Sequence, residues 1–203
     1  MQEKAARPEA DGQKLVIVGH GASPKGRGWG ARIDQYPVMR LKNPSWQTED
    51  DYGRRVDYMA ASTETLPVML DYKGKPKLYF GQPKRGSWNA VTEASFRSRT
   101  DIPLLIPIEV HRRWNAVFRE LSELPAGQCP NHSLGMAAIT YACEFIKPAR
   151  ILLVGFDNLL EPARMEYHKA DRGKWVTFHD FEAENRMLPM IEEAYGTEIR
   201  AFD

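Results

Sequence analysis

The stretch Lys14-Leu-Val-Ile-Val-Gly19 is a short apolar run rich in β-branched residues, and it ends in glycine. A second run of the same kind, Ile151 to Phe156, lies near the other end of the chain. Runs of this length and composition are typical of strands that are buried on both faces of a parallel sheet. The two segments therefore predict an α/β fold in which helices cover both faces of the sheet.

Weaker patterns alternate between and after these two runs. We expect further strands at residues 38–41, 56–60, 77–80, 176–178 and 198–201. Residues 102–110 contain two prolines, which restrict this segment to an edge strand or an extended connection. Helices are expected at residues 28–35, 63–70, 112–124, 133–146 and 181–195. Strands that alternate with helices predict a Rossmann-like three-layer sandwich with a mostly parallel sheet.

Composition limits the class of protein. A chain of 203 residues is long enough for one domain with a buried core, and we expect a disordered tail at 1–13 and a single domain at 14–203. The net charge of +1 gives no reason to expect polyanion binding through bulk electrostatics. The two cysteines do not form a disulfide framework, and neither a secretory signal nor a membrane-spanning run is visible. These features predict a cytoplasmic protein with no membrane span.

The loop after the first run, Gly19-His-Gly-Ala-Ser-Pro24, is suited to binding a phosphate. Glycines allow the backbone to approach the ligand closely, and a following helix offers amide donors. A dinucleotide fingerprint would need a third glycine where Pro24 stands, and an acidic residue where the chain has Arg40. The arginine would suit NADP. The loop alone therefore leaves open an NADP site, another kind of phosphate site, and a turn that binds no ligand.

Four segments in one order resemble the motifs of the sialyltransferases. Lys14 to Asn43 is similar to their large sialylmotif, and Asp51 to Asp57 is similar to the stretch that follows it. Pro130-Asn-His-Ser-Leu-Gly-Met136, with the strand at Ile151 to Phe156, resembles the small sialylmotif. Glu166-Tyr-His168 stands where the third motif belongs, and His179 to Glu184 fits the short His-x4-Glu motif.

The bacterial sialyltransferases are also similar, because their Gly-x-Asp matches Gly155-Phe-Asp157. The chain departs from the family at His20, where an Asn is expected, and at Asn43, which comes one place late after Lys42. The cysteine of the large motif is also missing.

The resemblance implies the GT-A-like variant of the fold and a metal-independent, inverting glycosyltransferase without a cofactor. Such an enzyme would move sialic acid or a related acidic sugar from a CMP-sugar to a hydroxyl of a glycan, glycolipid or small-molecule acceptor. The residues at the matching positions would bind the CMP-sugar: Gly19, His20, Gly21, Ala22, Ser23, Arg40, Lys42, Asn43, Ser133, Gly135, Phe156, Asp157 and Tyr167.

The chemistry of this transfer assigns roles to the remaining motif residues. Charge builds up on the departing phosphate, so amides of Gly21 to Ser23 and of the helix after Ser133 are expected to hold it. A protonated His168 would donate to that phosphate, helped by Tyr167. His179 is the candidate base for the acceptor hydroxyl. Glu184 follows five residues later and is expected to orient this imidazole or to support the local fold.

Several alternatives remain open from the sequence. The acidic run Glu49-Asp50-Asp51 is better explained as a solvated loop than as a metal motif, because metal ligands converge from several elements. The protein could instead be a CMP-sugar hydrolase, a silent nucleotide-sugar binder or an NADP oxidoreductase. The basic, aromatic stretch 73–99 would suit a nucleic-acid-modifying enzyme, which we regard as less favoured. His111 is expected at the surface or as a cap, and His132 as a cap or a ligand contact.

Overall fold

The protein is described by a computed structural model over residues 13–41, 47–66, 70, 75–83, 90–123, 131–160 and 180–203. One seven-stranded sheet runs through it in the order β5-β4-β3-β2-β1-β6-β7, and every neighbouring pair is parallel. The strands are β1 (Lys14–Val18), β2 (Val38–Leu41), β3 (Tyr58–Ser62), β4 (Leu78–Gln82), β5 (Leu104–Leu105), β6 (Arg150–Val154) and β7 (Glu198–Ala201).

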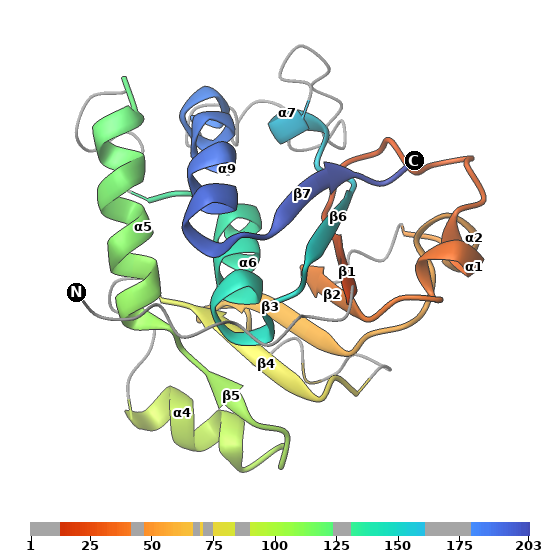
Figure 1. Ribbon diagram of the computed structural model, residues 1–203. Coiled ribbons are helices and arrows are strands. Elements are labelled where there is room, and N and C mark those ends of the chain that lie inside the picture. Colours follow the sequence, from red (N-terminus) through yellow and green to blue (C-terminus); the bar gives the residue numbers. More distant parts are fainter. Residues whose placement is uncertain are drawn as a thin grey trace, which may run out of the picture.

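Helices cover both faces of this sheet (Figure 1). On one face lie α5 (Ile108–Leu121), α6 (Leu134–Tyr141), which continues into a π-helical turn η1 (Ala142–Ile146), and α9 (Phe181–Tyr195). The opposite face carries α1 (Gly30–Ile33), α2 (Glu49–Tyr52) and α4 (Ala90–Arg97). A short helix, α7 (Asp157–Leu160), follows β6.

The alternation of side chains along β1 explains why both faces are covered. Leu15 and Ile17 pack against α5, α6 and α9, whereas Val16 and Val18 pack with residues of α1 and α2. All four side chains are at most 1% exposed. Successive residues of a strand point to opposite faces, so an unbroken apolar run must be covered on both sides.

The three-layer prediction is confirmed, and the sheet is parallel in all its pairs. Three short helices were missed: α2 in a segment interpreted as a polar loop, α4 in a segment without a clear pattern, and α7 directly after β6. Residues 1–12 of the expected tail, the expected strand at 176–178 and part of the expected helix at 63–70 lie outside the described residues. Within the described part of the chain, every helix is too short or too polar to cross a bilayer.

The order of the strands marks one point of the sheet as the usual place for a ligand in such folds. From β1 the chain proceeds to β2, β3, β4 and β5 on one side, and β6 then pairs with β1 on its other side. Open α/β sheets commonly bind their ligands at such a switch point, outside the carboxyl ends of the two central strands. These loops begin at Gly19 and Gly155.

Candidate functional site

The loops after β1 and β6 are joined by backbone hydrogen bonds. The amide of Gly19 donates to the carbonyl of Val154, and that of Gly21 to the carbonyl of Gly155, both at 2.7 Å. A β-carbon at Gly19 would lie 2.6 Å from the Gly155 oxygen and 2.9 Å from the Phe156 ring. Glycine is therefore required at position 19 because the two loops approach so closely.

Asp157, at the start of α7, holds the tip of the glycine loop. Its Oδ2 accepts a hydrogen bond of 2.9 Å from the amide of Ser23, and a β-carbon at Gly21 would lie 2.5 Å from its carboxyl carbon. The amides of Gly21 and Ser23 thus already donate within the protein. All amides from Gly21 to Ser23 were expected to hold a phosphate. Because two of them have partners within the protein, the amide of Ala22 remains as the candidate donor.

Side chains from the β2–α2 region fix the same loop from its other side. Nε2–H of His20 donates to the carbonyl of Leu41 at 2.7 Å. Gln47 donates to the carbonyl of Gly19 at 2.6 Å, and the Tyr52 hydroxyl donates to that of Gly21 at 2.9 Å. Burial raises the pKa of Tyr52, so its hydroxyl stays a donor. Neither Gln47 nor Tyr52 could be recognised from the sequence, because their partners are 28 and 31 residues away.

Arg40 was expected to contact the nucleotide, but its guanidinium is used inside the fold. The residue is 2% exposed, and it donates to the carbonyls of Tyr52 and Arg55, each at 2.9 Å. These bonds hold the segment that leads from α2 to β3. We therefore leave Arg40 out of the proposed ligand contacts. The neighbouring candidates Lys42 and Asn43 lie outside the described residues.

The acidic run at residues 49–51 forms α2, and its last carboxylate supports the segment after the glycine loop. Asp51 accepts from the amides of Gly26 at 2.9 Å and Gly28 at 3.0 Å, and these hydrogen bonds lower its pKa. Over the ranges that the structure describes, no group of three potential metal ligands is present. Asp51 is thus a structural carboxylate.

The first turn of α6 is bound to a buried carboxylate on α9. Glu184 accepts two hydrogen bonds from Ser133, from its amide at 2.5 Å and from its hydroxyl at 2.8 Å. The same hydroxyl caps α6 by accepting from the amide of Met136 at 3.2 Å. Glu184 is 1% exposed, and burial raises its pKa to about 7.

Phe156 links this turn to the glycine loop. A β-carbon at Gly135 would lie 2.9 Å from the Phe156 ring, which also packs against Gly19. The structure therefore brings together eight of the predicted positions, which the sequence places in four separate segments: Gly19, Gly21, Ser23, Ser133, Gly135, Phe156, Asp157 and Glu184.

The histidine predictions have mixed outcomes. His168, His179 and Tyr167 lie outside the described residues. Asp180, directly after His179, caps α9 by accepting from the amide of Ala183 at 3.0 Å. His111 was expected at the surface or as a cap, but it lies inside α5, where Pro107 is the N-cap residue, and it is 5% exposed because it shares the buried stripe of that helix.

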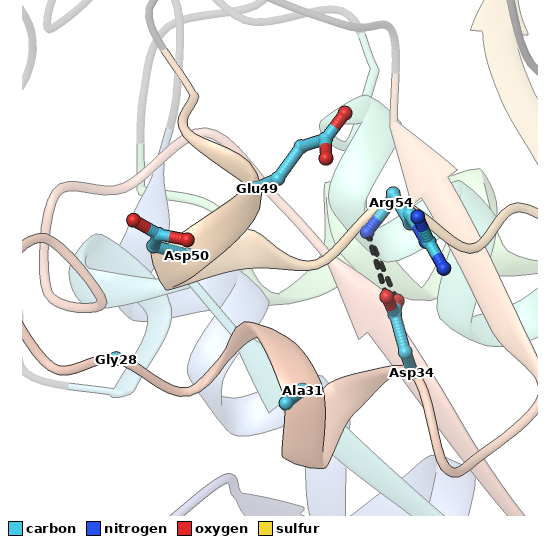
Figure 2. A pocket seen from close by; sticks show the side chains of 6 residues that line it. All are labelled: Gly28, Ala31, Asp34, Glu49, Asp50 and Arg54. Atoms are coloured by element: carbon cyan, nitrogen blue, oxygen red, sulfur yellow. Dashed lines mark hydrogen bonds between the residues drawn. The ribbon is translucent and has the colours of Figure 1, made fainter.

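A separate hollow of about 670 Å³ lies between α1 and α2 (Figure 2). In this hollow Asp34 accepts from the backbone amide of Arg54 at 3.0 Å. Its acidic side chains disfavour an anionic ligand. It is lined by Gly28, Ala31, Asp34, Glu49, Asp50 and Arg54. We therefore do not place the phosphate site here.

Comparison with known proteins identifies the fold. No family model matches the sequence, and no curated protein matches it significantly. Among solved structures, the chain is similar to the sialyltransferase CstII from Campylobacter jejuni in complex with cytidine-5'-monophosphate, with 14% identity, a TM-score of 0.63, and coverage of 93% of this chain and 79% of that one.

Two further solved structures agree. The alpha-2,3-sialyltransferase Cst-I from Campylobacter jejuni gives 14% identity and a TM-score of 0.60 over 99% of this chain and 79% of that chain. A mammalian sialyltransferase gives 18% identity and a TM-score of 0.56 over 94% of this chain and 68% of that chain. The identities are low, so these likenesses concern the fold. The chain has a sialyltransferase-like fold.

Proposed function

We propose that this protein is a glycosyltransferase that binds a CMP-sugar in the crevice between β1 and β6 and transfers the sugar to an acceptor hydroxyl. One observation carries the proposal. In a sialyltransferase-like fold, the glycine loop after β1 and the capped first turn of α6 meet across Phe156 at the switch point of the sheet. Open α/β sheets bind their ligands at this kind of place.

The phosphate of the donor would accept from amides of both loops. In the first turn of α6, Met136 is capped by the Ser133 hydroxyl and Ala137 donates to the Ser133 carbonyl. The amides of Leu134 and Gly135 precede them and are the donors that a helix start offers to an anion. Together with the amide of Ala22, they would form a set of donors that is fixed before the reaction.

In this proposal Glu184 positions the first turn of α6. Its two hydrogen bonds to Ser133 hold the turn in place from beneath. Of the two roles expected for Glu184, this is the support of the local fold; we leave orientation of His179 out of the proposal because both carboxylate oxygens accept from Ser133. Glu184 would act through Ser133 and would not touch the substrate.

The remaining roles rest on the resemblance of motifs. His179 would take the proton of the acceptor hydroxyl, and His168 with Tyr167 would stabilise the departing phosphate. Transfer would proceed with inversion and without a metal ion, and Lys42 and Asn43 would complete the nucleotide contacts. The NADP alternative loses its main support, because Arg40 is buried and bonded to backbone carbonyls.

A thermal-shift panel of CMP, CDP, UDP, GDP and NADP tests the proposal. CMP is expected to stabilise the protein selectively, by about 2.7 kcal/mol at a hundredfold excess over Kd. Ser133→Ala should lose most of this stabilisation. Ser98→Ala, at an exposed serine after α4, should keep it. Selective stabilisation by NADP, or no effect of CMP, would exclude the proposed site.

An activity assay separates transfer from hydrolysis. We expect a CMP-sugar to be consumed only when an acceptor hydroxyl is supplied, with sugar appearing on the acceptor. Equal release of free sugar with and without acceptor would instead identify a hydrolase.

A further inference from the structure

Two buried imidazoles lie edge to face beside the first turn of α6. His111, on α5, is 5% exposed, and His132, just before α6, is 2% exposed. Their ring centroids are 4.8 Å apart, and the rings are inclined by 72°. Phe118 packs its ring edge to face against His132. The pair is therefore closed off from solvent.

The hydrogen bonds of Asn115 determine where His111 carries its proton. The Asn115 carbonyl oxygen accepts from the amide of His132 at 3.0 Å, which places the Asn115 NH₂ group on the other side. This group donates to Asn131 at 3.0 Å and to Nε2 of His111 at 2.9 Å. Since Nε2 of His111 is an acceptor, the proton of the neutral ring is on Nδ1.

The same reasoning applies to His132. Its Nδ1 lies 3.1 Å from the carbonyl of Ser133, and a carbonyl can only accept, so Nδ1 carries the proton and Nε2 carries the lone pair. Gln82, at the end of β4, donates to the His132 carbonyl at 3.0 Å and ties the segment to the sheet. Among the residues that the structure describes, neither Nδ1 of His111 nor Nε2 of His132 has a hydrogen-bond partner.

Neither ring can therefore accept a second proton favourably. A proton on Nε2 of His132 would be buried without an acceptor and would face a second imidazole. A proton on Nε2 of His111 would face the donating NH₂ of Asn115. Burial lowers the pKa of His111 to about 3 and that of His132 to about 4.

The charged groups around the pair offset this cost only in part. On α5, Arg119 lowers the pKa of His111 further. From α9, Glu184 binds Ser133 and is protonated below its own pKa of about 7, which favours the closed turn in acid equally in the wild type and in the histidine variants. Asp180, which precedes α9, is bonded to Ser122. The contact from β4 is the uncharged Gln82. Among the residues that the structure describes, no carboxylate is bonded to either imidazole, so acidification adds positive charge that is not paired.

We infer that protonation of the His111–His132 pair at acidic pH releases the segment Asn131–Ser133, together with the first turn of α6, from its position in the fold. When the two imidazoles take up protons, the segment must leave its buried position. The consequence for CMP affinity rests on the proposed function, whereas the release itself does not depend on any ligand.

The direction of the pH dependence follows from the lowered pKa values. A released imidazole titrates near pH 6.5, so the closed state is fully stable above that pH and is lost as pH falls towards 4. Relative to a protein that lacks both imidazoles, the opening constant is expected to rise about 30-fold for each imidazole between pH 8 and pH 5.

Hydrogen exchange of the full chain, read by mass spectrometry and corrected for intrinsic rates, measures this release. The double variant His111→Gln/His132→Asn keeps the neutral hydrogen bonds, because the glutamine oxygen can accept from Asn115 and the asparagine NH₂ can donate to the Ser133 carbonyl. Residues 131–141 should open on acidification in the wild type and not in the double variant. His132→Asn alone should remove one of the two 30-fold factors by which acidification raises the opening constant. His20→Gln removes a histidine outside the pair and should respond like the wild type.

Exchange in β1 and β6 shows whether the opening is local. Protection of these strands at pH 8 should be the same in every variant, which verifies that each one folds. The inference is overturned if the double variant keeps the acid response, or if β1 and β6 open together with residues 131–141 at every pH. No ligand is present, so a protein that fails to bind CMP still gives a decisive result. If CMP does bind, its affinity should fall more steeply with acid in the wild type than in the double variant.

Discussion

Alanine at position 30 is expected to destabilise the protein by about 3 kcal/mol. The added β-carbon would overlap the carbonyl oxygen of Glu49 and would lie 2.7 Å from that of Asp50. Both are backbone atoms of α2, so no side-chain rotation relieves the clash and α1 and α2 must separate. Urea unfolding of the wild type and Gly30→Ala measures the loss.

The effect should extend to the ligand site. The segment around α2 carries Gln47 and Tyr52, which hold the carbonyls of Gly19 and Gly21, so its displacement should also weaken CMP binding. Gly81→Ala is the matched control. Its β-carbon would meet side-chain atoms and no backbone: Cγ1 of Ile106 at 3.1 Å, Cδ1 of Leu66 at 3.2 Å and Cγ2 of Thr63 at 3.5 Å, so a small shift of these side chains can relieve the contacts. We expect it to cost at most about 1 kcal/mol, and an equal loss in both variants would contradict the packing account.

Replacing Glu184 should change how stability depends on pH. The pKa of this carboxyl is raised to about 7 by burial, whereas in the unfolded chain it is about 4.3. Its contribution is therefore fully present below pH 4.3 and is lost as pH rises through 7. Glu184→Gln, which resembles the protonated form, lacks this loss. From pH 5 to pH 8.5, the unfolding free energy of Glu184→Gln minus that of the wild type should rise by about 2 to 3 kcal/mol.

Two substitutions test whether the buried contact with Ser133 is the cause. Glu182→Gln changes an exposed carboxylate in the same turn of α9, and its unfolding free energy should depend on pH in the same way as that of the wild type. Glu184→Ala leaves both donors of Ser133 without an acceptor and opens a cavity, so it should destabilise by about 3 kcal/mol at pH 5. Parallel stability curves for Glu184→Gln and the wild type would show that the carboxyl does not titrate as proposed.

The layers of the fold could be predicted because they depend on local patterns. Unbroken apolar runs gave β1 and β6, and helical spacing indicated α5 and α9. The polar α2 has no apolar periodicity and is ordered by its contacts with α1 and the glycine loop, so no local pattern predicts it.

The site could be predicted only as a set of positions. The bonds from Ser23 to Asp157 and from Ser133 to Glu184 join residues 134 and 51 positions apart, and no spacing along the chain encodes them. Arg40 was assigned to the ligand although it alternates along β2 with Met39 and Leu41, which face α6. Alternation therefore turns Arg40 towards α2. His111 stands three and seven residues before Trp114 and Phe118, and this spacing could have indicated its burial.

The location of bound CMP tests the central claim most directly. A crystal structure of the protein with CMP is expected to place the phosphate between the Gly19–Ser23 loop and the first turn of α6, within hydrogen-bonding distance of the amides of Ala22 and Gly135. A phosphate bound in the hollow between α1 and α2, or crystals in which CMP at saturating concentration leaves the crevice empty, would contradict it.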